Sequence, residues 1–246
     1  MYLNYNCRVI WQIIGCYDII LTQTYIFGKM LLTVLEMLSL TMQMQLNKEF
    51  LLQKGMNMES LELNRCSWAN RSKEEMEYHD KEWGRPEFDD LRLFAMLNLE
   101  GQQAGLSWTT ILRKRENFYK AYDNFDPAVI IHYDNRKIEE LLQDPGIIRN
   151  RLKIKAVISN AAAYFDVINQ YGSFHDFFWR YVDNTQIKNH WKSLSEVPAS
   201  TPLSDTISKD MKKLGFKFVG TTIIYAYMQS IGMVNDHLCD CPLHEV

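Results

Sequence analysis

From Asn64 onward, the chain is a succession of amphipathic stretches in which apolar residues recur at helical spacing. In residues 88–103, the apolar positions 91, 93, 94, 96, 97 and 99 share one face, and Asp89 or Asp90 is suited to cap the first turn. Similar stretches follow at residues 107–122, 126–144, 151–171, 173–182, 204–215 and 218–232. No segment alternates apolar and polar residues convincingly, as a half-buried strand would. The sequence therefore predicts an all-α domain at residues 64–246.

Three residues mark expected helix ends. Ser107 is suited to cap the helix of residues 107–122, and Pro127 suits a first helical turn because its missing N–H would have no partner there. Gly172 is expected to end the long helix that precedes it, because glycine accepts the left-handed conformation at a helix C-terminus.

Residues 1–63 differ from the rest of the chain and form a predicted N-terminal extension. Polar residues interrupt their apolar character at Gln12, Asp18, Gln23, Lys29 and Glu36. No run of about 18 apolar residues remains, so neither a membrane-spanning helix nor a secretory signal is expected. Met56 and Met58 stand just before the domain, which favours an extension translated from an upstream start. A membrane-associating or partner-binding pair of helices is the alternative.

The composition limits the class of protein. Of the 246 residues, 47% are hydrophobic and 23% are charged, as in folded globular proteins. The cysteines are too few and too scattered for a disulfide-rich secreted fold: Cys7, Cys16, Cys66, Cys239 and Cys241. We therefore expect a reducing, cytoplasmic compartment, in which clustered cysteines bind metal or remain thiols.

The stretch NDHLCDC, residues 235–241, is typical of part of a metal site. His237 and Cys241 are four residues apart, so one helical turn would bring an imidazole and a thiolate to the same ion. Cys66 and His79 lie upstream and would complete a Cys₂His₂ set that joins the two ends of the domain. The alternatives are competing ligands in the tail, a disulfide or simple burial: Cys239, His244 and a Cys66–Cys241 bond.

A second group of candidates lies in NLEGQQAGLSW, residues 98–108. Glu100 stands near the end of an apolar helix, where the helix dipole disfavours an anion, so a partner or ligand is expected. Leu106 lies in the turn between two helices, where a large apolar side chain is expected to pack or insert into something. A solvated carboxylate and a leucine beneath a loop are the alternatives.

Aromatic residues are concentrated in sequence on either side of Glu100, at Trp68, Tyr78, Trp83 and Trp108. Aromatic faces around one carboxylate suit a flat cationic ring, which can stack, gain cation–π attraction and pair its charge. Core packing of these rings is the alternative.

Two basic clusters predict contacts with phosphate. The first follows the Pro-Gly turn of residues 145–146, and the second lies nearer the C-terminus: Arg149, Arg151, Lys153 and Lys155, then Lys209, Lys212, Lys213 and Lys217. A helix start with free N–H groups and positive charge can hold a nucleic-acid phosphate. A solvated helix face is the alternative.

Several motifs in one order resemble a known family. EGQQAGLSW, YHDKEWG, PGIIRNRLKI, STPLSD, LGFKFVGTT and VNDH together resemble DNA-3-methyladenine glycosylase type I, the Tag family of bacterial base-excision repair enzymes. The resemblance extends from about Arg65 to Cys241 and does not include the N-terminal extension. It implies a helix-hairpin-helix glycosylase fold that binds duplex DNA, flips out an alkylated nucleotide and hydrolyses its N-glycosidic bond.

The resemblance also implies roles for individual residues. It implies one structural zinc ion per chain, held by Cys66, His79, His237 and Cys241, so the four-residue spacing selects Cys241 over Cys239. Glu100 would hydrogen-bond the extruded base, Tyr78 and Trp108 would stack against it, and Trp68 and Trp83 would line the same space. Leu106 would fill the gap in the base stack. The remaining expected DNA contacts are Gln103, Gly146, Arg149, Arg151 and Lys153.

The pattern departs from related glycosylases at the expected hairpin. The turn reads Gly146, Ile147, Ile148, Arg149 and Asn150. No lysine stands where bifunctional relatives place a Schiff-base amine, so the sequence predicts a monofunctional enzyme acting as a monomer with water as nucleophile. Asp166 lies near the region where those relatives carry an aspartate and ranks below Glu100. A non-catalytic, zinc-containing protein that binds DNA lesions is the alternative, whereas four protein ligands would leave zinc no open position for hydrolysis.

Overall fold

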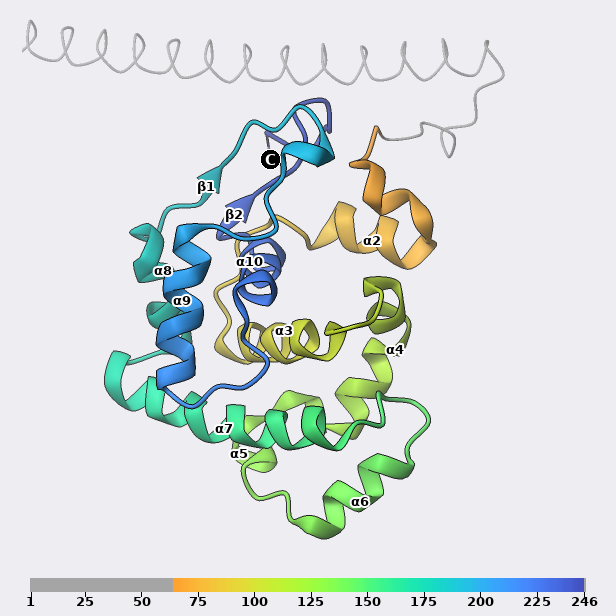
Figure 1. Ribbon diagram of the computed structural model, residues 1–246, viewed down its shortest axis with the longest axis vertical. Coiled ribbons are helices and arrows are strands. Elements are labelled where there is room, and N and C mark those ends of the chain that lie inside the picture. The colour runs from red at the N-terminus through yellow and green to blue at the C-terminus, as the bar shows by residue number, and fades with distance from the viewer. Residues whose placement is uncertain (1–63, 246) are drawn as a thin grey trace, which may run out of the picture. The chain divides into compact units, whose positions relative to one another are not determined.

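The computed structural model describes residues 64–245, and the predicted extension at residues 1–63 lies outside them (Figure 1). The α-helices are α2 (Lys73–Lys81), α3 (Asp90–Gln103), α4 (Trp108–Ala121), α5 (Pro127–Ile130), α6 (Asn135–Gln143), α7 (Arg151–Tyr171), α8 (Phe174–Trp179), α9 (Pro202–Lys213) and α10 (Thr221–Ser230). Short 3₁₀ turns and strands connect them: η2 (Ser67–Arg71), η3 (Asp123–Phe125), η4 (Arg180–Val182), η5 (Leu194–Glu196), β1 (Ile187–Lys188) and β2 (Val234–Asn235). The predicted all-α character is confirmed for the described residues.

Helix α3 lies at the centre of the domain. It contacts α4, α7, α8 and α10, and Figure 1 shows it between α10 and α7. Leu93, Phe94 and Leu97 of α3 are almost completely buried, because the predicted apolar face meets helices on several sides. Leu91, predicted on the same face, is instead 47% exposed, since the first turn of α3 lies at the edge of the core.

The predicted helix ends are confirmed. The Asp89 carboxylate accepts a hydrogen bond from the Arg92 amide at 2.9 Å, and the Ser107 hydroxyl accepts one from the Thr110 amide at 3.2 Å. Gly172 follows α7 at a φ of 90°, in the region that favours glycine. These contacts satisfy amides that would have no partner within the helix.

The structure also contains two short strands that the sequence does not predict. Ile187 pairs with Val234 and Lys188 with Asn235 in a parallel ladder. Each strand has two residues, which is too short for a period-two pattern to be visible in sequence. The ladder places residues 187–191 beside the C-terminal tail.

Helices α9 and α10 pack against each other and are joined by residues 214–220. Thr201 and Ser204 form a capping box at the start of α9, with the Ser204 amide donating to the Thr201 hydroxyl at 3.2 Å. Among the described residues, no helix combines the length and the apolarity needed to cross a membrane.

Candidate active site and metal centre

A pocket of about 290 Å³, here called the aromatic pocket, collects the residues predicted around Glu100. Six predicted site residues line it: Trp68, Tyr78, Trp83, Glu100, Gln103 and Trp108. They come from η2, α2, the turn after α2, α3 and the start of α4. The fold therefore brings together residues that the sequence only places within the same forty positions.

The aromatic rings of the pocket meet at an angle. The ring centroids of Trp68 and Trp83 are 4.9 Å apart at an interplanar angle of 73°, and those of Tyr78 and Trp108 are 5.3 Å apart at 57°. Tilted and edge-on contacts are favourable arrangements for aromatic pairs. Since neither pair is stacked in parallel, a planar ligand can lie against these rings without displacing a stacked partner.

Glu100 lies in the last turn of α3 and is only 3% exposed. Burial raises the pKa of its carboxyl to about 8, against an opposing hydrogen bond from the Ser230 hydroxyl. No described basic side chain contributes to this shift. The pocket therefore holds a carboxyl group without a cationic partner, and a bound cation would favour its ionised form.

Asp236 is a second carboxylate in the wall of the aromatic pocket, and the sequence interpretation missed its role. It is 1% exposed and accepts hydrogen bonds from four side chains. Asn189 and Trp191 each donate to Oδ1 at 2.7 Å, while Tyr225 and Gln229 donate to Oδ2 at 2.6 and 2.7 Å. Asp236 thus joins α10 to the segment after β1. It stands within the VNDH motif, but the sequence does not show that these four donors meet it.

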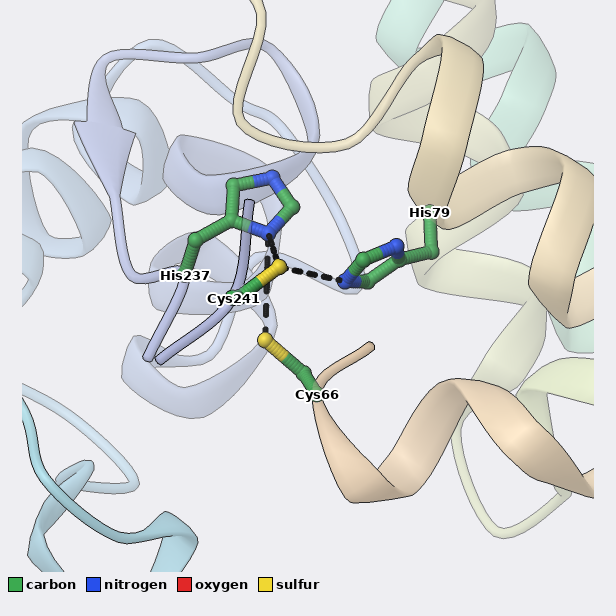
Figure 2. Close-up of side chains that lie close together, drawn as sticks. All are labelled: Cys66, His79, His237 and Cys241. Carbon is green, nitrogen blue, oxygen red and sulfur yellow. Dashed lines mark hydrogen bonds between the residues drawn. The ribbon is translucent and has the colours of Figure 1, made fainter. Parts of the chain in front are cut away.

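The predicted metal ligands converge in a buried group, here called the Cys/His cluster, of Cys66, His79, His237 and Cys241 (Figure 2). His237 Nδ1 lies 3.7 Å from Cys66 Sγ and 3.5 Å from Cys241 Sγ, and His79 Nε2 lies 3.7 Å from Cys241 Sγ. Tetrahedral zinc with ordinary bond lengths sets sulfur-to-nitrogen edges of about 3.6 Å. The cluster therefore has the donors and the spacing to hold a metal ion.

Both imidazoles are oriented by a hydrogen bond from the nitrogen that faces away from the cluster. His79 Nδ1 lies 2.9 Å from the Asp80 carboxylate, which also accepts from Arg65 at 2.7 Å. His237 Nε2 donates to the Trp83 carbonyl at 3.1 Å. Each N–H is thereby used on the outside, which leaves the inner lone pair for an ion.

The two thiols of the Cys/His cluster are free, so the alternative Cys66–Cys241 disulfide is not formed. A hydrogen bond from Cys66 lowers the pKa of the Cys241 thiol, and the same pairing raises the pKa of Cys66. The Leu238 amide also donates to Cys66 Sγ at 3.3 Å. A thiolate is the form that binds metal, so these contacts suit a cation at the centre.

Gly84 lets the turn after α2 approach the cluster closely. Its φ is +74°, and a Cβ atom added there would lie 3.0 Å from Cδ2 of His237. Glycine is therefore required both by the backbone conformation and by the contact. The final residue of the YHDKEWG motif thus has a structural reason.

The first basic cluster is only partly available to a phosphate. Lys153 is 5% exposed, and its ammonium donates to the carbonyls of Gln102 and Ala104 at 2.7 and 2.8 Å. It is therefore an interior residue that fixes the end of α3, not the surface cation that the sequence predicts. Arg149 is exposed, and Arg151 is exposed but paired with Glu139 at 2.6 Å.

The amides expected to be free beside this cluster have partners. The Gly146 amide donates to the Asp144 carboxylate at 2.7 Å. Asn150 accepts from the amides of Leu152 and Lys153 at 2.9 and 3.1 Å, so it caps the start of α7. The prediction of free N–H groups at this helix start is wrong, because asparagine is itself a good N-cap.

Two other predicted positions lie at the surface. Leu106 is 40% exposed in the turn between α3 and α4. Asp166 is exposed on α7 and is not among the residues that line the aromatic pocket. The structure therefore leaves Leu106 free for contact with a partner and separates Asp166 from Glu100.

Comparisons with known proteins agree with this site. A family model described as methyladenine glycosylase matches residues 68–244. DNA-3-methyladenine glycosylase 1 of Escherichia coli (strain K12) is 48% identical over 179 residues, which cover 73% of this chain and 96% of the relative. The corresponding enzyme of Haemophilus influenzae is 46% identical over 178 residues, which cover 72% and 96%.

Solved structures show the same likeness. A crystal structure of 3-methyladenine DNA glycosylase I has a TM-score of 0.71 and 50% identity, covering 74% of this chain and 100% of that one. The enzyme from Staphylococcus aureus, whose structure concerns 3-methyladenine recognition, has a TM-score of 0.71 and 34% identity, covering 73% and 96%. The chain belongs to the methyladenine glycosylase family.

Proposed function

We propose that this protein is a monofunctional DNA glycosylase that excises 3-methyladenine from alkylated DNA in base excision repair. The observation that carries the proposal is Glu100, a buried carboxyl group among aromatic rings with no cationic partner of its own. The relatives named as 3-methyladenine glycosylases, at up to 48% identity over nearly their whole length, support the same substrate.

The chemistry of the lesion matches the pocket. Methylation at N3 places a positive charge on adenine, which weakens the glycosidic bond and makes the base a good leaving group. The charged ring gains attraction from the Glu100 carboxylate and from the indole and phenol faces of Trp108 and Tyr78. Normal adenine lacks the charge and gains less, so recognition of the flipped base supplies much of the discrimination. Water is the nucleophile.

The absence of a suitable amine supports the monofunctional assignment. Among the described residues, no lysine lines the aromatic pocket. The buried ammonium of Lys153 is occupied by the carbonyls of Gln102 and Ala104, and burial lowers its pKa. A Schiff base with the sugar would require an amine directed into the pocket.

The Cys/His cluster would hold one structural zinc ion. Two thiolates and two imidazoles are a common ligand set for such sites, and the ion would supply a crosslink between the two ends of the domain. Four protein ligands leave no position for a reacting water, so the cluster would not act as a zinc hydrolase. Its free thiols suit the reducing cytoplasm of a bacterium.

Duplex DNA would contact the surface through the α9–α10 hairpin, which serves as the helix-hairpin-helix element. Lys209, Lys212 and Lys213 line a surface hollow beside Thr221. In the described structure, no side chain caps α10, whose N-cap is Gly220, so its first amides are available to a phosphate. This hairpin fits the role better than the turn at Gly146, where the amides are occupied.

The remaining DNA contacts would come from the turn between α3 and α4. Leu106 is exposed there and would fill the space that the flipped nucleotide leaves in the stack. Lys153 holds this turn from inside through the Ala104 carbonyl. Arg149 and Arg151 would contact phosphates, Arg151 after exchanging its ion pair with Glu139. Gln103 would contact DNA from the pocket rim, and the protein would act as a monomer.

Release of free base tests the function directly. The full chain is incubated with DNA methylated on adenine N3, and free 3-methyladenine is measured by chromatography, beside Glu100→Gln and the exposed control Glu116→Gln. We expect release by the wild type and the control and strongly reduced release by Glu100→Gln. Binding of methylated DNA without release would instead favour the non-catalytic lesion-binding protein.

A further inference from the structure

A second group of metal-ligating side chains lies outside the Cys/His cluster. His190, Cys239 and His244, here called the tail cluster, each offer a ligand atom, and these atoms all lie within 4.8 Å of one another. None of them belongs to the Cys/His cluster or lines the aromatic pocket. We propose that the tail cluster is a second metal site, which takes an exchangeable divalent cation of the zinc class.

The backbone holds the two halves of this site together. The Cys239 amide donates to the Trp191 carbonyl at 2.9 Å, and the Asn189 amide donates to the Asn235 carbonyl at 3.1 Å as a continuation of the β1–β2 ladder. These bonds fix the segment that carries His190 against the tail that carries Cys239. The convergence of the three side chains therefore follows from the fold and does not depend on a single rotamer.

The surroundings of His244 indicate a missing cation. One ring nitrogen lies 2.9 Å from the Asn189 carbonyl and the other lies 2.8 Å from the Glu245 carboxylate, while the residue is only 4% exposed. A neutral imidazole has one N–H donor and one lone pair, so one of its nitrogens presents a lone pair to an oxygen. A metal ion at that nitrogen would remove the conflict and leave the N–H to the other oxygen.

The ligand chemistry determines which ion would bind. One thiolate and two imidazoles suit zinc and similar borderline cations and are a poor set for calcium or magnesium, which prefer oxygen. Three protein ligands leave a fourth position for water or for the exposed carboxylate of Glu245. Because His190 and Cys239 are exposed whereas all four ligands of the Cys/His cluster are buried, the ion here would be held more weakly and exchange with solvent.

An ion at the tail cluster would also act on the aromatic pocket. Asn189 and Trp191, on either side of His190, both donate to Asp236 in the pocket wall. Joining His190 to Cys239 and His244 would hold that wall segment against the tail. Binding of the second ion is therefore expected to raise the thermal unfolding midpoint, since a ligand that binds only the folded state stabilises it.

Metal counting tests the site. The full chain is treated with a mild chelator that leaves tightly held metal in place, dialysed against increasing zinc, and analysed for zinc per chain by mass spectrometry. The wild type is compared with Cys239→Ser, with His190→Ala and with His132→Ala, which removes an exposed histidine elsewhere. Circular dichroism verifies that each variant is folded, and Co²⁺ in place of zinc reports a thiolate ligand through its charge-transfer band.

We expect the wild type and His132→Ala to bind one more zinc per chain than Cys239→Ser and His190→Ala. The Co²⁺–thiolate band of this second ion should disappear in Cys239→Ser. Equal zinc content in all four proteins, or an additional ion that survives either of the two substitutions, would overturn the three-ligand site. A proton on both nitrogens of His244 would then account for its contacts.

Discussion

The carbonyl oxygen of Trp83 accepts a hydrogen bond from Nε2 of His237 at 3.1 Å, while the Trp83 side chain lines the aromatic pocket. The same residue therefore orients a metal ligand and forms a wall for the base. Cys66 and Leu238 also line the pocket, and the Leu238 amide donates to Cys66 Sγ. The Cys/His cluster and the pocket thus share residues, so a change in the cluster is expected to alter the shape of the pocket.

Loss of one ligand tests this connection. We expect Cys241→Ser to lose its tightly bound metal and to cost about 2–5 kcal/mol of folding stability, as does removal of a long-range crosslink. Cys239→Ser, measured without added zinc, should keep both the metal and the stability. Metal analysis and thermal unfolding of the two variants decide between the ligands, and the reverse pattern would show that Cys239 is the true ligand.

Gly84 offers a second test with a matched control. Gly84→Ala would force a left-handed alanine and push its Cβ against His237, whereas Gly105→Ala has a similar φ of +76° with no atom within 4 Å. We expect Gly105→Ala to cost about 1–2 kcal/mol from backbone strain alone. Gly84→Ala should cost more and should also reduce metal content. Equal effects of the two changes would mean that contact with His237 is unimportant.

The raised pKa of Glu100 predicts a pH dependence of stability. Its carboxyl titrates near 8 in the folded chain and near 4.5 in the unfolded chain, so unfolding releases a proton between these values. The stability that this proton contributes is fully present below pH 4.5 and is lost as the pH rises towards 8. Glu100→Gln should remove this part of the pH dependence, as denaturant unfolding at several pH values would reveal.

The same group predicts a pH dependence of activity. An ionised Glu100 attracts the cationic base, so kcat/KM for excision should rise with pH up to about 8 and then level off. Glu100→Gln should give a lower and flatter profile, and Glu100→Ala should lose excision with little change in helical content. A wild-type profile that is flat from pH 6 to 9 would contradict the assigned role.

Charge at the α9–α10 hairpin predicts the salt dependence of DNA binding. Lys212→Gln should reduce the slope of log affinity against log salt by about 0.9, the value for one phosphate contact. Lys192→Gln, an exposed change elsewhere, should leave the slope unchanged. Lys153→Met should lower thermal stability without changing the slope, because its ammonium bonds to carbonyls in the interior. Fluorescence anisotropy at several salt concentrations measures all three.

Asp236 predicts a combined loss of stability and activity. Asp236→Asn would present an amide N–H₂ to two of the four donors that the carboxylate now accepts, and each buried donor without a partner costs about 1–3 kcal/mol. We expect a lower unfolding midpoint and weaker excision. Asp166→Asn, on the exposed face of α7, should change neither. Loss of activity in Asp166→Asn would return that residue to the site.

The features that the sequence predicted correctly depend on short local patterns. Asp89, Ser107 and Gly172 act within one turn of their own position, so caps and ends can be read from neighbouring residues. The aromatic pocket and the Cys/His cluster were reached through the order of family motifs, since spacing left Cys239 and His244 open as ligands.

The features that the sequence missed depend on distant contacts. The β1–β2 ladder joins residues 187–188 to 234–235, and each strand is too short to show a pattern. Lys153 has the same local surroundings as the exposed Arg151 and Lys155, but the end of α3 reaches only Lys153. The hairpin was assigned to the wrong turn because Pro145 and Gly146 resemble a hairpin turn in sequence, although Asn150 and Asp144 occupy the amides there.

The Cys/His cluster joins Cys66 to His237 across 171 positions of the chain. Bringing such distant residues together is entropically costly and is expected late in folding, after the helices have formed and packed. Contacts that are absent from the folding transition state act on the rate of unfolding and not on the rate of folding. A bound ion would therefore determine how long the folded domain persists, and chelation should shorten its lifetime while leaving its folding rate almost unchanged.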